Sequence, residues 1–194
     1  MVGVRQFDTV EALDAAMAVF WDLGYEATSV DDLARATGLS RSSLYSAFGN
    51  KQSLFLQVID HYLSISRKRF FEELEQEDLR EALSGALNVL KGRLTDRNSK
   101  AGCLLVLAAE NSETKAPEIR RRVAEAFANE ETAFYNRFRK AQSDGQLPPG
   151  EDARALARFF AAQGRAMGIN ARVSNDPTIH DDIISTAMKV LPEG

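Results

Sequence analysis

The chain has 194 residues, of which 44% are hydrophobic and 27% charged, a balance typical of globular proteins and too apolar for a disordered chain. Its longest apolar run, CLLVLAA at 103–109, is too short to cross a bilayer, and MVGVRQFD at the N-terminus lacks the apolar segment of a signal peptide. A single cysteine, Cys103, excludes an internal disulfide framework and a cysteine-based zinc finger. We therefore expect a cytoplasmic protein without a metal or other cofactor.

The charge balance argues against unspecific binding to nucleic acid. The net charge is −4, and residues 1–51 hold four basic side chains against seven acidic ones. A protein that binds DNA through a broad positive field has the opposite balance. Any DNA contact from this region must therefore come from a few placed residues.

The apolar pattern predicts an all-helical fold, because apolar residues recur at helical spacing and no proline precedes residue 117. The first helix begins at Asp8 or Thr9, with one stripe formed by Val10, Leu13, Met17, Phe20 and Gly24. Gly24 suits the left-handed residue at its end.

Two short helices follow. Ser29 and Asp32 form a capping-box pattern that starts the second helix, which stops at Gly38, and Ser40 can cap the third. Two helices joined by so short a turn have the layout of a helix-turn-helix. If Leu44 faces inward, the third helix leaves a polar face for a major groove. An ordinary helical hairpin with that polar face in solvent is the alternative interpretation.

The rest of the chain reads as longer helices. Asn50 is the expected cap of a fourth helix that runs to about Leu74, and further helices are expected over about 79–96, 102–111, 116–143, 153–173 and 178–191. The turn cluster SDGQLPPGED at 143–152 is the strongest break. We expect a helix-turn-helix DNA-binding domain at 1–50 and a helical effector-binding and dimerisation domain at 51–194.

The sequence ALDAAMAVFWDLGYEATSVDDLARATGLSRSSLYSAFGNKQSLFLQVIDHYL at 12–63 resembles the N-terminal domain of TetR/AcrR-family transcriptional regulators. The elements that carry the resemblance are the aromatic-rich first helix, GYEATSVDDLARATGLS and SLYSAFGNK with the LF that follows. The resemblance implies a homodimeric repressor that a small-molecule effector releases from a palindromic operator. GCLLVLAAE at 102–110 and LARFFAAQGRAM at 156–167 look like a subgroup of that family.

The resemblance also implies a set of DNA contacts. The implied contacts with phosphates come from Thr28, Ser29, Tyr45 and Lys51. The implied contacts with base edges come from Arg41 and Ser42, and Ser43 and Ser46 lie beside them. Many relatives begin with a basic arm, but here Arg5 is the only charge before Asp8. We therefore expect no minor-groove arm and a shallow dependence of affinity on salt.

The last two helices carry apolar stripes that predict a dimer interface, although core packing within one chain would produce the same stripes. The residues are Phe159, Phe160, Gln163 and Met167 on one helix and Ile183, Ile184, Ala187, Met188 and Leu191 on the other. The middle helices would hold the effector pocket, for which the candidates are Tyr62, Phe70, Cys103, Leu107, Glu110, Phe127, Phe134 and Tyr135.

Two other functions stay open. The acidic N-terminal region is compatible with a helical sensor or interaction protein that binds no DNA. Cys103 is either a thiol that senses an oxidant or electrophile, or a small buried side chain. An enzyme is not expected, because no GxSxG, HExxH, P-loop or GxGxxG pattern occurs and the two histidines, His61 and His180, lie far apart in the sequence.

Overall fold

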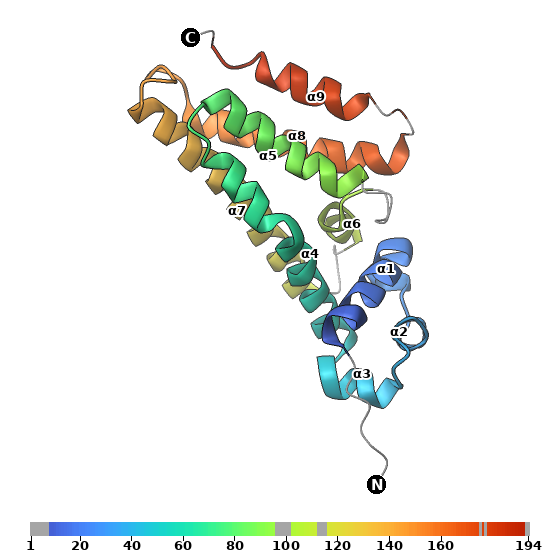
Figure 1. The fold of residues 1–194 in the computed structure, drawn as a ribbon. Coiled ribbons are helices and arrows are strands. Elements are labelled where there is room, and N and C mark those ends of the chain that lie inside the picture. Colours follow the sequence, from blue (N-terminus) through green and yellow to red (C-terminus); the bar gives the residue numbers. More distant parts are fainter. Residues whose placement is uncertain (1–7, 96–101, 112–115, 175, 177, 193–194) are drawn as a thin grey trace.

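A computed structural model describes residues 8–95, 102–111, 116–174, 176 and 178–192. Over these ranges the chain forms nine α-helices and no strand, which confirms the predicted all-helical fold (Figure 1). The helices are α1 (Thr9–Ala27), α2 (Val30–Thr37), α3 (Arg41–Phe48), α4 (Lys51–Leu74), α5 (Leu79–Thr95), α6 (Leu104–Asn111), α7 (Pro117–Ser143), α8 (Ala153–Val173) and α9 (Ile179–Met188).

The first four helices start at the caps that the sequence predicts. The Asp8 carboxylate accepts from the backbone N–H of Val10 at 2.8 Å, and Asn50 accepts from that of Ser53 at 2.8 Å. Ser29 and Asp32 form a complete capping box before α2, and Ser40 caps α3. These side chains satisfy N–H groups that have no partner inside the helix.

Helix α1 departs from the prediction at Gly24 and on its buried face. Gly24 has a φ of 76° but sits at a kink inside α1, which continues to Ala27 instead of ending there. In the predicted stripe Val10 is wrong, since its side chain is 54% exposed, whereas Phe20 and Gly24 are buried and Leu13 and Met17 pack against the lower cluster, which is described below. The fully buried face is made by Ala12, Ala16, Phe20 and Gly24, spaced four residues apart, with Trp21 beside them.

The helices enclose two clusters of buried side chains, one at each end of the molecule. The lower cluster joins α1, α2, α3, the first half of α4, α6 and the start of α7. The upper cluster joins the second half of α4, α5, the rest of α7, α8 and α9. Helices α4 and α7 lie side by side and pass through both clusters (Figure 1). A boundary at residue 50 therefore does not separate the two cores, because α4, α6 and α7 help to close the core of the N-terminal end.

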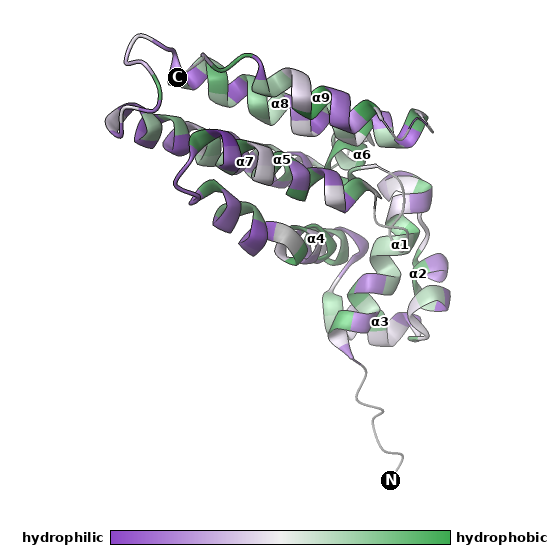
Figure 2. Ribbon diagram, turned by 45° about the horizontal axis from the view of Figure 1, so that its top comes forward, coloured by the Kyte–Doolittle hydropathy of each residue, from purple (hydrophilic) through white to green (hydrophobic). Residues whose placement is uncertain are grey.

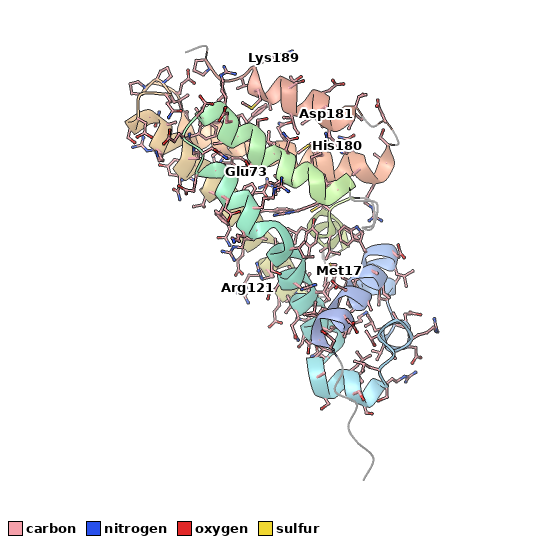
Figure 3. The ribbon with its side chains drawn as sticks, in the orientation of Figure 1. Met17, Glu73, Arg121, His180, Asp181 and Lys189 are labelled. Carbon is pink, nitrogen blue, oxygen red and sulfur yellow. The ribbon has the colours of Figure 1, made fainter. Side chains whose placement is uncertain are left out.

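Most of the helices are amphipathic, with hydrophobic and hydrophilic residues interspersed along the ribbon (Figure 2), whereas α6 is largely apolar and its residues 104–108 are all buried. Helix α9 covers the upper cluster on its outer side and is fixed by polar contacts with α5. Lys91 pairs with Asp181 at 2.5 Å, and the Arg80 guanidinium donates to the carbonyls of Met188 and Leu191 (Figure 3 labels Asp181 on α9). Over the residues described, a helix with the length and apolar character needed to span a membrane does not occur.

Candidate DNA-binding surface and effector pocket

Helix α3 has one buried side and one open side. Leu44 and Phe48 are each 4% exposed and fix the helix against the lower cluster. Arg41, Ser42, Tyr45 and Ser46 are exposed, and Ser43 is half-buried. The predicted base-reading residues therefore share the open face of a short helix that the core holds in place. We call this open face the recognition surface.

Arg41 on the recognition surface has a partner that the sequence did not reveal. Its guanidinium donates from Nε and Nη2 to both carboxylate oxygens of Asp31 on α2. This bidentate pair links α2 to α3 and raises the pKa of Arg41. Both side chains are more than half exposed, so the pair lies in solvent on the side that would face DNA.

The structure corrects the role expected of Thr28. Its side chain is 1% exposed, and its hydroxyl donates to the carbonyl of Gly24 at 2.6 Å, at the C-terminal end of α1. A buried hydroxyl that is already donating cannot reach a phosphate, so the predicted side-chain contact is wrong. Ser29 is exposed and belongs to the capping box, and its contact with phosphate stays a prediction.

Lys51 is also placed differently from the expectation. Its ammonium donates to the carbonyls of Tyr25 at 2.9 Å, Glu26 at 3.4 Å and Thr28 at 3.0 Å, and it lies 4.5 Å from the centre of the Tyr25 ring. These contacts use all three of its protons. In this conformation Lys51 caps the C-terminal end of α1 and joins it to α4, and is not free to contact a phosphate.

Two adjoining pockets lie between α4, α5, α7 and α8. The inner pocket has a cavity volume of about 20 Å³ and is lined by Tyr62, Leu90, Arg93, Leu94, Cys103, Leu105, Phe127, Glu130, Gly164 and Arg165. The outer pocket has a cavity volume of about 50 Å³ and is lined by Leu63, Arg67, Phe70, Phe71, Arg93, Arg122, Ala126, Asn129 and Glu130. Arg93 and Glu130 belong to both linings, so they stand between the two pockets.

The structure brings half of the predicted effector residues to these pockets. Tyr62, Cys103 and Phe127 line the inner pocket and Phe70 lines the outer one. Three others do not line either pocket: Leu107 lies in the lower cluster, Phe134 is fully buried in the upper cluster, and Tyr135 lies under the guanidinium of Arg154. The side chain of Glu110 lies outside the described residues.

The charged pocket residues were missed by the sequence interpretation. Glu130 follows Phe127 by three residues and precedes Phe134 by four, so it occupies an apolar stripe of α7. That position was the available signal for a buried carboxyl group. Arg93 and Arg165 come from α5 and α8, and nothing local to either residue shows that they meet Glu130.

Burial controls the ionisation of the inner pocket. It raises the pKa of Glu130 to about 7, although the charges of Arg93 and Arg165 act in the opposite direction. Burial also raises the pKa of Tyr62 and of Cys103, and the Tyr62 hydroxyl donates to Cys103 Sγ at 3.6 Å. The Cys103 thiolate is therefore disfavoured in this conformation, which argues against a thiol that senses electrophiles.

The predicted dimer residues divide into two groups. Five are buried in the upper cluster and hold one chain together, namely Phe160, Met167, Ile184, Ala187 and Leu191. For these the prediction of an interface is wrong. Phe159, Gln163, Ile183 and Met188 are only half-buried, so they can still contribute to a dimer interface.

A metal centre has no support in the described part of the chain, where no three or more His, Cys, Asp or Glu side chains are grouped to hold an ion.

Comparison with known proteins relates this geometry to a family. Residues 12–58 match the family described as "Bacterial regulatory proteins, tetR family", and residues 77–187 match "Tetracyclin repressor-like, C-terminal domain". The chain is 30% identical to the HTH-type transcriptional repressor ComR of Escherichia coli (strain K12), over 97% of this chain and 91% of ComR. It is also 30% identical to the uncharacterized HTH-type transcriptional regulator YezE of Bacillus subtilis (strain 168), over 96% of this chain and 97% of YezE.

Solved structures have the same fold. One is a cysteine mutant of the TetR family transcriptional regulator CifR, complexed with 26-bp double-strand operator DNA. It matches this chain with a TM-score of 0.91 and 29% sequence identity, over 98% of this chain and 100% of CifR. The regulator FadR from Bacillus subtilis, in complex with stearoyl-CoA, has a TM-score of 0.74 at 15% identity and shares the fold, covering 95% of this chain and 100% of FadR. Together with the family matches to both ends of the chain, these likenesses show that the protein belongs to the TetR family of bacterial transcriptional regulators.

Proposed function

We propose that this protein is a transcriptional repressor that binds operator DNA through α3 and is released by a small-molecule effector. The observation that carries the proposal is the recognition surface, where Arg41, Ser42 and Tyr45 are exposed on a helix fixed by Leu44 and Phe48. Hydrogen-bond donors on such a helix can reach base edges and phosphates in a major groove. CifR bound to its operator and the repressor ComR support the same function.

We infer that the working form is a homodimer, because one helix of eight residues reads too few bases for a unique site. Two recognition helices about 34–36 Å apart would read two half-sites of a palindrome. Outward-facing residues of α8 and α9 at alternating spacings of three and four supply a seam for a second copy. They are Ala155, Phe159, Ala162, Ala166, Ile169 and Val173 on α8, and Ile179, Ile183 and Thr186 on α9, with Val190 just beyond the end of α9.

This outer seam replaces the buried residues first expected at the interface. Ile169 is 48% exposed and Val173 is 77% exposed in the single chain, which is unusual for such apolar side chains at one end of a helix. The small residues Ala155, Ala162 and Ala166 would allow close approach of the partner's helices.

The inner pocket is the proposed effector site, and α6 is a route from it to DNA. Cys103 and Leu105 line the pocket at the start of α6, whereas Leu104 and Ala108 belong to the lower cluster and α6 packs on α1. A ligand that displaces the start of α6 or tilts α4 would move the recognition helices. The size of the response is set by the ligand's difference in affinity for the two arrangements.

The proposal includes a cytoplasmic location, where operator DNA is found, and no catalytic activity. Its division into a DNA-binding region at 1–50 and an effector and dimerisation region at 51–194 is functional, since the two cores share α4 and α7.

Selection from a library of random duplexes tests DNA binding and needs no defined operator sequence at the outset. The full chain is expected to enrich a two-fold symmetric site. Arg41→Ala and Tyr45→Ala variants are expected to lose at least tenfold in affinity for that site, while Arg139→Ala, on the far end of α7, binds as the unmodified protein does. Absence of any enriched sequence, or full affinity in both α3 variants, would contradict the proposal.

A further inference from the structure

An unpaired guanidinium lies in the wall of the inner pocket. Arg165 makes no hydrogen bond to any residue that the structure describes, and its Nε is buried without a partner. Its guanidinium lies 4.7 Å from the centre of the Phe127 ring, which holds its plane in place. Buried polar groups are nearly always hydrogen-bonded, and an arginine has five N–H donors. An arginine whose buried Nε lacks an acceptor, at the wall of a pocket, therefore points to a ligand that supplies acceptors.

Arginine side chains dominate the polar side of the inner pocket. Arg93 and Arg165 line it together with the carboxyl group of Glu130, which is only about half ionised near pH 7. The other titratable groups facing the pocket, Tyr62 and Cys103, are neutral at this pH because burial raises the pKa of each. The guanidinium of Arg165, beside a carboxyl group that carries only a fraction of its negative charge, favours an anion.

The outer pocket extends this character toward solvent. Arg67 lies over the Phe71 ring at 5.6 Å and has no acidic partner among the described residues. Arg122 is neutralised by Asp60, with which its Nε makes a hydrogen bond of 2.7 Å. The approach to the inner pocket is thus aromatic and positively charged.

The remaining walls of the inner pocket are apolar, formed by Leu90, Leu94, Leu105 and the face of Phe127. Gly164 adds a close wall without a side chain, since a Cβ there would lie 2.7 Å from Leu90 Cδ1 and 3.2 Å from Glu130 Oε1. Apolar walls with a few polar groups at one side are the usual composition of a small-molecule site.

We propose that the inner pocket binds a small organic acid, whose carboxylate accepts hydrogen bonds from Arg165 and Arg93 and whose compact apolar part lies against Leu90, Leu94, Leu105 and Phe127. This inference rests on the proposed effector function of the pocket and names the chemical class of the effector. A cavity of about 20 Å³ has room for about one water molecule. An acid must therefore displace side chains to enter, and Cys103 and Leu105 transmit that displacement to α6.

Anion binding in this place is coupled to proton uptake. A carboxylate beside Glu130 disfavours its charged form and so raises its pKa further. Acid binding therefore strengthens as the pH falls from 8 toward 6, a range in which a ligand carboxyl with a pKa of about 4 to 5 stays ionised.

Calorimetric titration of the full chain with a panel of monocarboxylates of two to eight carbons, including benzoate, tests the proposal. At least one acid is expected to bind, at least tenfold more tightly than its neutral amide and than the matched amine. Arg165→Gln is expected to reduce the affinity at least tenfold, whereas Arg139→Gln, whose guanidinium contacts Gln142 on the surface, leaves it unchanged. Failure of every acid to bind, equal binding of amide and acid, or preferential binding of the amine to Glu130 would each overturn the proposal.

A second variant removes space instead of charge. Gly164→Ala adds a methyl group that crowds Leu90 and Glu130, so it is expected to weaken acid binding with both arginines in place. Circular dichroism melting of each variant separates lost binding from lost folding. Unchanged acid affinity in a folded Gly164→Ala variant would reject this location.

Affinity for the selected duplex, measured with and without the bound acid, keeps the two proposals distinguishable. An acid that binds through Arg165 without changing DNA affinity supports the ligand class and rejects its role as effector. Tight DNA binding together with no acid bound rejects the ligand class alone.

Discussion

Replacement of Glu130 by glutamine should change the dependence of stability on pH in a defined direction. Burial raises the pKa of this carboxyl from 4.5 to about 7 in the folded chain. A raised folded-state pKa gives a contribution to stability that is fully present below the unfolded value and is lost as the pH rises through the folded value. The unmodified protein therefore loses stability between about pH 4.5 and 7 through this group, while Glu130→Gln does not.

The size of the effect follows from the two pKa values. At about 1.36 kcal/mol for each pKa unit, the difference between 4.5 and about 7 corresponds to roughly 3 kcal/mol. Glu130→Gln should thus be more stable than the unmodified protein by up to about 3 kcal/mol at pH 8, and about equal to it at pH 4.5. Typical domains are stable by about 5–15 kcal/mol, so the change is large enough to measure.

Urea unfolding followed by circular dichroism, at one protein concentration and at several pH values, measures the difference. With a urea dependence of about 3 kcal/mol/M, the midpoints should separate by about 1 M at pH 8 and converge at pH 4.5. Glu125→Gln is the matched control, because Glu125 lies on the surface of the same helix beside Arg121. A difference between Glu130→Gln and the unmodified protein that is constant with pH would refute a raised pKa of this buried carboxyl.

Three further predictions concern the DNA-binding end and the dimer. Lys51→Met should lower the free energy of unfolding by about 1–2 kcal/mol, because three carbonyls at the end of α1 lose their donor; an unchanged urea midpoint would contradict this. Asp31→Asn leaves Arg41 without its neutralising partner, so the dimer's DNA affinity should depend more steeply on salt, with the slope of log K against log salt more negative by about 2. The unmodified protein should have a shallow slope, and a slope near −10 would refute this. Ala162→Arg should give monomers in sedimentation while the exposed Ala128→Arg on α7 stays dimeric, and dimers in both would reject the α8 seam.

Local rules explain why so much of the fold was predictable. Whether a residue caps a helix depends only on its own side chain and the next three residues. The sequence therefore marks the starts of α1 to α4 at Asp8, Ser29, Ser40 and Asn50, where the structure also has them. Helical periodicity also places the helices over the rest of the chain, with boundaries that shift by a few residues at most. Such signals do not depend on what a helix packs against.

The faces of the helices could not be assigned in the same way. Core and interface stripes have the same spacing, so α8 and α9 offered no local reason to assign Phe160 to the core and Ala162 to the surface. Lys51 illustrates a second limit. Its position near the start of α4 suggests a phosphate ligand, but the end of α1, more than twenty residues earlier in the sequence, takes all its donors.

The candidate pocket was least predictable because its polar groups come together only through the packing of three helices. Arg93, Glu130 and Arg165 lie on α5, α7 and α8, and burial rather than sequence position raises the pKa of Glu130. The same arrangement explains how a small ligand could act on DNA. Moving an equilibrium from 1:99 to 99:1 requires about 5.5 kcal/mol of differential affinity. One buried charged group that gains its hydrogen bonds is worth about 1.5–3 kcal/mol. The unpaired Arg165 in each of two subunits therefore offers a repressor dimer about the energy that release from an operator needs, provided that the acid fits only the released arrangement.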